Sequence, residues 1–84
     1  GMIYKCFEDA DFVNESYKIA ETLSAMPTRG LAFTKRALNE SMSNNLADQL
    51  KLEDELQFAA GHTDDYREGV AAFLEKRKPV FKGQ

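Results

Sequence analysis

The spacing of apolar side chains in the first third of the chain predicts a helix. Phe12, Ile19 and Leu23 are separated by whole numbers of helical turns, so they share one face of a helix expected over 11–26. Pro27 lacks an amide donor and disfavours helical geometry in the residue before it, so it is expected to end this helix or to begin the next.

Three further helices are indicated by apolar periodicity together with breaks and caps. A second helix is expected over 28–42, and the polar run at 43–45 offers N-cap residues for a third helix over 46–60. Thr63 is expected to cap a fourth helix that Pro79 closes. The shared faces are Leu31, Leu38 and Met42 in the second helix, and Tyr66, Val70, Phe73, Leu74 and Arg77 in the fourth. The pattern therefore predicts a mainly all-α fold with about four helices.

A short strand is predicted ahead of these helices. Residues 2–7, Met-Ile-Tyr-Lys-Cys-Phe, are rich in β-branched and aromatic side chains, and Cys6 within them is expected to be a small buried hydrophobe. A single strand leaves its ladder groups unpaired, and no partner strand follows in the sequence. This strand remnant indicates that 1–84 is a single helical segment of a larger, sheet-containing protein.

The predicted third helix carries a polar line inside a broad apolar arc. Gln49, Glu53 and Gln57 are spaced four apart, which implies burial against a surface that offers hydrogen-bond partners. Glu53 is the one acid within the arc, and a buried acid is a candidate for catalysis. A structural carboxylate that joins two helices is the favoured interpretation, because no second catalytic group lies in register with it.

The charge distribution changes the picture of possible ligands. The composition is globular, with 43% hydrophobic and 30% charged residues, and the formal net charge is −3. Residues 1–75 are acidic overall, whereas the charged side chains of 76–84 are all basic: Lys76, Arg77, Lys78 and Lys82. A basic tip on an acidic body favours a small anionic group over nucleic acid, which requires a basic surface across its footprint. Alternatively, the basic residues only complement the macrodipole of the preceding helix.

Several kinds of site are not expected. His62 has no second histidine or cysteine at ligand spacing, so no metal site is predicted, and it is the only imidazole that could activate a nucleophile. The single Cys6 cannot form an internal disulfide, which favours a reducing, cytoplasmic setting. No apolar run is long enough to span a membrane.

Phe73 and Lys76 are the candidate binding residues. They are three apart and are expected to share a helix face, where the aromatic ring could pack on a nucleotide base while the ammonium meets a phosphate. On spacing alone the plainer interpretation is favoured, with Phe73 in the core and Lys76 on the surface.

Three stretches resemble the enoyl-CoA hydratase/isomerase, or crotonase, family: PTRGLAFTKRALNE at 27–40, LKLEDELQFAAG at 50–61 and DDYREGVAAFLEKRKPVFKG at 64–83. The last stretch is similar to the closing signature of that family, and residues 1–7 resemble its strand just after the catalytic core. The signature is matched by Asp65, Glu68, Gly69, Ala72, Phe73, Glu75, Lys76, Arg77, Pro79 and Phe81. The resemblance covers essentially the whole chain.

The resemblance implies that this chain is the C-terminal helical region of an enzyme acting on acyl-CoA thioesters. The family's spiral core, with its oxyanion-hole amides and catalytic carboxylates, has no counterpart in these residues, so the chain alone is expected to be inactive and to hold no catalytic residue. CoA enters as part of the substrate, not as a separate cofactor. The resemblance implies that Phe73 and Lys76 correspond to family residues that reach the CoA nucleotide. This implication favours a binding role for the two residues over the interpretation of Phe73 as a core residue and Lys76 as a surface lysine.

The resemblance also implies a homo-oligomer, because the C-terminal helices of the family help to build a trimer. Hydratases and isomerases share these motifs, so the choice between the two reactions stays open. The alternative is an autonomous helical module that self-associates without catalytic activity. A small helical nucleic-acid binder is disfavoured by the acidic body, and no membrane partner is expected.

Overall fold

The computed structural model describes residues 1 and 3–84, and these residues form four helices. The helices are α1 (Asp9–Ser24), α2 (Thr28–Ser41), α3 (Leu46–Gly61) and α4 (Asp64–Glu75). The predicted all-α class is therefore confirmed, and each predicted helix is present.

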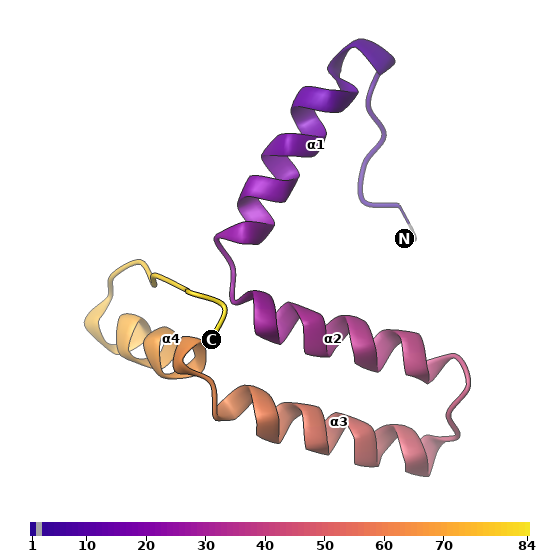
Figure 1. Cartoon of the computed structure of the whole chain (residues 1–84), viewed down its shortest axis with the longest axis vertical. Coiled ribbons are helices and arrows are strands. Elements are labelled where there is room, and N and C mark those ends of the chain that lie inside the picture. The colour runs from indigo at the N-terminus through magenta and orange to yellow at the C-terminus, as the bar shows by residue number, and fades with distance from the viewer. Residues whose placement is uncertain (2) are drawn as a thin grey trace.

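An antiparallel pair, α2 and α3, forms the platform of the structure (Figure 1). These two helices make the most extensive interhelical contact among the described residues, and α3 buries Leu52 and Leu56. The side-chain amide of Gln49 on α3 donates a hydrogen bond of 3.2 Å to the carbonyl oxygen of Ala37 on α2. The short α4 follows at the end of this pair, and the last residues run back along it (Figure 1).

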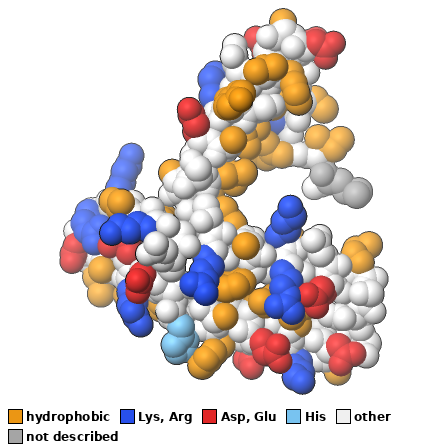
Figure 2. Space-filling view, in the orientation of Figure 1, with side chains coloured by type: hydrophobic (Ala, Val, Ile, Leu, Met, Phe, Trp, Pro, Cys, Tyr) orange, Lys and Arg blue, Asp and Glu red, His pale blue; other side chains and the backbone are white. Residues whose placement is uncertain are grey.

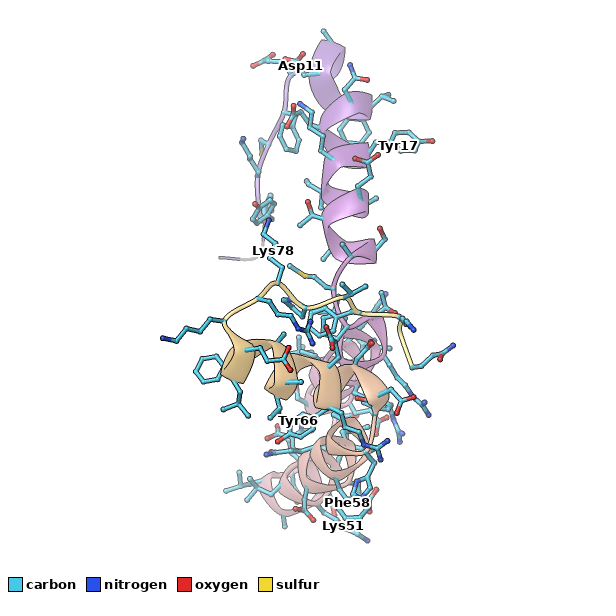
Figure 3. The ribbon with its side chains drawn as sticks, turned by 90° about the vertical axis from the view of Figure 1, so that its left-hand side faces the viewer. Asp11, Tyr17, Lys51, Phe58, Tyr66 and Lys78 are labelled. Carbon is cyan, nitrogen blue, oxygen red and sulfur yellow. The ribbon has the colours of Figure 1, made fainter. Side chains whose placement is uncertain are left out.

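The first helix, α1, points away from this platform (Figure 1). None of its residues is buried, and its large side chains include Phe12, 58% exposed, and Tyr17, 69% exposed. Tyr17 projects outward from the helix (Figure 3), and hydrophobic side chains are visible along α1 in the space-filling view (Figure 2). The sequence correctly places a helix here, but the described residues do not cover its apolar face.

The described residues enclose only a small core. The buried apolar side chains among them are Leu52, Leu56 and Ala72. The radius of gyration is 16.0 Å, compared with about 12 Å for a compact domain of this length. Large apolar side chains on α1 and α4 are therefore left exposed.

The predicted strand over 2–7 is wrong for residues 3–7, which form no strand and lead irregularly into α1. Met2 lies outside the described residues. Cys6, which was expected to be buried, is exposed. A strand is stabilised by the ladder it forms with a neighbour, and the described residues supply no such neighbour.

The interpretation of Glu53 as a buried carboxylate that joins two helices is also wrong. Glu53 is exposed, and its carboxylate accepts a hydrogen bond of 2.8 Å from Gln49 on its own helix. Gln49, not Glu53, reaches across to α2. The helical period correctly places the polar line on the side of α3 that borders the α2–α3 groove, but the groove is open to solvent at Glu53.

None of the helices in the described part of the chain has the length and apolar character needed to cross a membrane.

Thr63 joins α3 to α4, and replacing it tests this junction. Its hydroxyl accepts a hydrogen bond of 3.1 Å from the Tyr66 amide and donates one of 2.7 Å to the Ala60 carbonyl, and the residue is 7% exposed. The predicted N-cap is thus confirmed. Thr63→Ala should lower the free energy of unfolding by about 1–2 kcal/mol in urea denaturation, because the cap is lost.

A matched control for this change is Thr22→Ala. The Thr22 hydroxyl is exposed and bonds only to the Lys18 carbonyl within α1. This substitution should change the free energy of unfolding by less than about 0.5 kcal/mol. Equal losses in the two variants would contradict the assigned role of Thr63.

Candidate functional site

The candidate site lies where α4 ends, and the chain turns sharply there. Lys76 has left-handed backbone angles, with φ 56° and ψ 36°. Its amide donates to the carbonyl of Phe73 at 3.3 Å, and the next amide, that of Arg77, donates to the carbonyl of Ala72 at 3.0 Å. This pair of hydrogen bonds is the Schellman arrangement, which stops a helix by satisfying its last carbonyl groups.

Two expectations about this end of the helix are wrong for the same reason. Pro79 does not close α4, because the left-handed residue at 76 already prevents the helix from continuing past Glu75. Phe73 and Lys76 therefore do not share a helix face, since Lys76 lies beyond the helix. Their relative position is set by the turn and not by helical spacing.

Residues 76–84, here called the C-terminal strap, return along α4 and are held there by Asp65. This residue is 3% exposed, and its two carboxylate oxygens accept hydrogen bonds from the amides of Lys82, at 2.7 Å, and Gly83, at 2.8 Å. The amide of Asp65 donates in turn to the carbonyl of Gln84 at 3.0 Å. Because both oxygens are occupied by the backbone of the strap, Asp65 serves the structure and is not available to a ligand.

Glu68 holds the strap one turn further along α4. Its carboxylate accepts a hydrogen bond of 2.8 Å from the amide of Val80 and two from the guanidinium group of Arg77, at 2.5 and 2.8 Å. Arg77 also donates from Nε to Glu75 at 2.6 Å. The bonds from Arg77 and then from Val80 lower the pKa of Glu68 to about 2, and the same pairing raises the pKa of Arg77.

Two glycines give the strap the space that it requires. The ring of Phe81 lies against Gly69, 3.6 Å from where a Cβ atom would stand. At Gly83 φ is +74°, and a Cβ atom there would lie 2.5 Å from the Thr28 hydroxyl at the start of α2. The strap therefore packs on α4 and ends against α2.

Phe73 and Lys76 differ from most of the other matched signature residues. Phe73 is 83% exposed, and Lys76 is also exposed and forms no ion pair with any residue that the structure describes. The residues that hold or accommodate the strap are Asp65, Glu68, Gly69, Glu75, Arg77 and Phe81, while Ala72 is buried beneath them. Phe73 and Lys76 are thus available to contact something outside the described residues.

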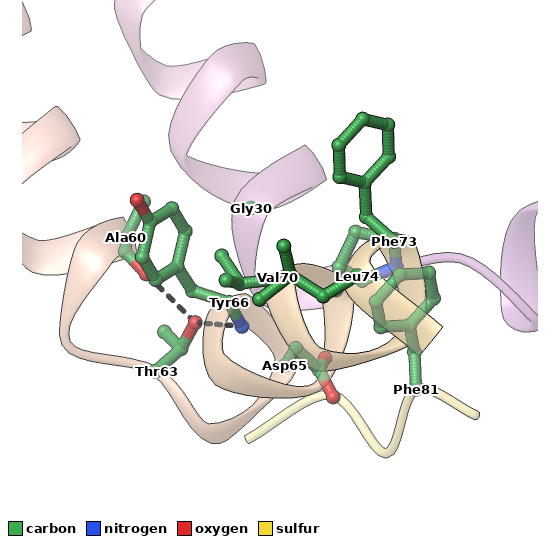
Figure 4. A pocket seen from close by; sticks show the side chains of 11 residues that line it. Gly30, Ala60, Thr63, Asp65, Tyr66, Val70, Phe73, Leu74 and Phe81 are labelled. Atoms are coloured by element: carbon green, nitrogen blue, oxygen red, sulfur yellow. Dashed lines mark hydrogen bonds between the residues drawn. The ribbon is translucent and has the colours of Figure 1, made fainter. Parts of the chain in front are cut away.

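An apolar cleft of about 420 Å³ lies beside Phe73, which is one of its lining residues. Its wall includes Tyr66, Val70 and Leu74 of α4, and Phe73 stands at its edge (Figure 4). The predicted apolar face of α4 is confirmed for these side chains, although they line an open cleft and not a core. Arg77 was wrongly assigned to this face, because it lies beyond the end of the helix. Lysine and arginine side chains gather at this end of the molecule (Figure 2). An apolar surface next to positive charge suits a ligand that is partly aromatic or apolar and partly anionic.

The other candidates from the sequence form no site. His62 bonds through Nδ1 to the carbonyl of Phe58 at 2.7 Å, and the two rings lie 4.2 Å apart, so the imidazole belongs to the end of α3. Within 1 and 3–84, no three histidine, cysteine, aspartate or glutamate side chains are grouped so that they could hold a metal ion.

Known proteins resemble this chain in both sequence and fold. The family model for enoyl-CoA hydratase/isomerase matches residues 1–84. The 1,2-epoxyphenylacetyl-CoA isomerase of Escherichia coli is 43% identical over 84 residues, which is all of this chain and 32% of that protein. A probable enoyl-CoA hydratase of Rhodobacter capsulatus is 42% identical over the same length and is covered to 33%.

Solved structures show the same relationship. A crystal structure of an enoyl-CoA hydratase from Polaromonas sp. JS666 superposes with a TM-score of 0.88 at 34% identity, over 98% of this chain and 32% of that one. A second enoyl-CoA hydratase structure, from Geobacillus kaustophilus, also has a TM-score of 0.88 at 31% identity, over 93% of this chain and 30% of that one.

This helical segment has the crotonase fold of those structures, and the chain belongs to the enoyl-CoA hydratase/isomerase family. It spans about a third of the length of the relatives that it matches. The resemblance stated from the motifs alone is thereby confirmed.

An acid titration tests how the strap is held. The pKa of Glu68 is lowered from 4.5 to about 2 in the folded chain, so its bonds stabilise the fold above pH 4.5 and lose that effect as the pH falls towards 2. The Glu68 carboxyl carbon, followed by NMR, should titrate with a midpoint near 2, and the Val80 amide shift should change with it.

The control for this titration is Arg77→Met, which removes the largest cause of the lowered pKa. In this variant the Glu68 midpoint should move up towards 4.5. A midpoint near 4.5 in the unsubstituted chain would show that Glu68 does not hold the strap.

Proposed function

We propose that this chain is the C-terminal helical segment of an enzyme that acts on acyl-CoA thioesters, and that it contributes Phe73 and Lys76 to the site for the CoA nucleotide. The observation that carries this proposal is the exposure of these two signature residues while their neighbours hold the strap. Family membership supplies the class of substrate, since the relatives are named for CoA thioesters.

The chemistry of a CoA nucleotide suits the end of α4. The exposed ring of Phe73 offers a flat surface for adenine, and the Lys76 ammonium offers three donors to a phosphate. Lys78 and Lys82 on the same strap add to the local positive potential. CoA is part of the substrate in this proposal, so no separate cofactor is required.

The chemical step belongs to the parts of the relatives that this chain does not span. The described residues bring no pair of carboxylates into the apolar cleft, where Asp65 has both oxygens occupied by the strap. We therefore propose that the 84 residues alone neither hydrate nor isomerise an acyl-CoA. An isomerase and a probable hydratase both match this chain, so the proposal does not choose between isomerisation and hydration.

A second candidate function is self-association, and the open faces of α1 and α4 favour it. Phe12 and Tyr17 on α1, and Tyr66 and Leu74 on α4, are all more than half exposed. Apolar surface of this extent marks an interaction site in a soluble protein. Contact with other copies, as part of an oligomeric enzyme, would cover these faces.

Lys76→Ala tests the nucleotide site. The variant is best made in a chimera in which residues 1–84 replace the matching segment of the Escherichia coli isomerase, to which they are 43% identical. The KM for the acyl-CoA substrate should rise severalfold at low salt with little change in kcat, because the contact is the same in the ground and transition states. The effect should shrink at high salt, since the contact is exposed.

The matched control is Lys51→Ala, which removes the same charge from an exposed position on α3. Its KM should match that of the unsubstituted chimera. Phe73→Ala should raise KM more than Lys76→Ala does, since it removes packing area as well. An unchanged KM for Lys76→Ala at low salt would overturn the nucleotide assignment.

Light scattering and an activity assay on the 84-residue chain test the remaining proposals. We expect a dimer or larger assembly, because the apolar faces are covered by other copies, and no measurable hydration of crotonyl-CoA. A compact monomer near 9.5 kDa at high concentration would contradict self-association. Hydration by a preparation free of contaminating enzymes would contradict the assignment of the chemical step to other parts of the family fold.

A further inference from the structure

Lys76 stands in a conformation that its residue type does not favour. It is the only non-glycine residue with a positive φ in the part of the chain that the structure describes. Its position just after a helix, in a Schellman turn, is one that glycine usually occupies, because a Cβ atom is strained there. Such strain persists where the surrounding structure imposes it, and an observed outlier of this kind points to function.

The strained residue is fixed on both sides. On the helix side, its amide bonds to the Phe73 carbonyl. On the strap side, Arg77 bonds through its amide to the Ala72 carbonyl and through its guanidinium group to Glu68. Glu68 also accepts the Val80 amide, so the chain after Lys76 cannot move away from α4 without breaking several bonds at once.

A purely structural role for this turn does not explain a lysine. Glycine at 76 would allow the same backbone hydrogen bonds without strain, and the Lys76 side chain has no ion-pair partner among the described residues. A lysine that served only solubility would not need to occupy this turn. The conformation and the residue type are in conflict unless the direction of the Lys76 side chain matters.

We propose that Asp65, Glu68 and Arg77 act as positioning residues, here called the clamp. They hold Lys76 in its left-handed conformation and thereby direct its ammonium group to a phosphate of the bound nucleotide. The inference deepens the proposed function and rests on it. Release of the strap would let the backbone at 76 relax to a more favourable conformation. The ammonium group would then leave its place although the lysine itself is intact.

The first experiment separates strain from charge with three substitutions of Lys76 in the chimera. Lys76→Gly should raise the melting temperature, because the strain is relieved, and should raise KM severalfold with kcat unchanged. Lys76→Ala keeps the strain and should raise KM without stabilising the protein. Lys76→Arg retains a positive charge on the same backbone and should keep KM within about twofold.

The second experiment releases the strap and leaves Lys76 in place. Glu68→Ala removes the acceptor for both Arg77 and Val80. In the 84-residue chain, hydrogen exchange at the amides of Val80 and Lys82 should become faster. In the chimera, KM should rise severalfold with kcat unchanged. Should Glu68→Ala fail to fold, Arg77→Gln removes the ion pairs of Arg77 with Glu68 and Glu75 and leaves the Val80 bond to Glu68 in place. The same rise in KM and the same faster exchange are expected.

The matched control is Asp64→Ala. This change removes the same charge from the first turn of α4, where Asp64 pairs only with Arg67 and does not touch the strap. Strap exchange and KM should both stay as they are in the unsubstituted proteins. A rise in KM in this control would show that the loss of any acidic charge on α4 produces the effect, and would overturn the clamp.

The outcomes distinguish the clamp from the nucleotide site. If Lys76→Ala leaves KM unchanged, the proposed function itself fails. If Lys76→Ala raises KM while Glu68→Ala frees the strap and leaves KM unchanged, the nucleotide site stands and the clamp is wrong. Unchanged strap exchange in both Glu68→Ala and Arg77→Gln would also overturn the clamp.

Discussion

Two carboxylates of α4 that accept backbone amides of the C-terminal strap determine the structure of this end of the molecule. A buried carboxylate is unfavourable unless its oxygens are satisfied, and Asp65 meets this requirement with the amides of Lys82 and Gly83. Bonds of this kind are stronger than those between neutral groups because the acceptor is charged. Glu68 adds a forked ion pair with Arg77. The place where α4 ends and the path of the strap both follow from these contacts.

These contacts also divide the signature of the family into residues that face inward and residues that face outward. Glu68, Gly69 and Phe81 secure the strap on α4, and Ala72 is buried beneath it. Phe73 remains exposed at the edge of an apolar cleft. The division gives a structural role to most residues of the signature in this segment. Phe73 and Lys76 are therefore the signature side chains on which the proposal of ligand binding rests.

The features that depend on local sequence were predictable, and those that depend on distant partners were not. The cap at Thr63 and the apolar period of α4 act within a few residues, so the sequence indicates both. The strand was wrongly predicted at residues 3–7 because a strand requires a partner, which composition does not reveal. The burial of Glu53 was wrongly predicted because a helical wheel identifies a face and not what covers it.

In the candidate site, too, the features that depend on distant contacts were not predictable from the sequence. Phe73 and Lys76 were selected through the resemblance, and helical spacing assigned their relative position incorrectly. The left-handed conformation of Lys76 was beyond prediction because lysine does not favour it. It is imposed by contacts such as that between Arg77 and Glu68, which lie nine residues apart on either side of the helix end. A carboxylate one or two turns before the end of a helix, followed by a basic residue just beyond that end, is the pattern that could have indicated the turn.

The most direct test of this account is a double-variant cycle in the chimera, in which KM is measured for Glu68→Ala, Lys76→Ala and the two together. Because Glu68 is held to act through Lys76, removing Glu68 should have no further effect once the Lys76 ammonium group is gone. We expect the double variant to have the same KM as Lys76→Ala alone. A KM in the double variant equal to the product of the two separate fold-changes would show that the residues act independently, and would contradict the account.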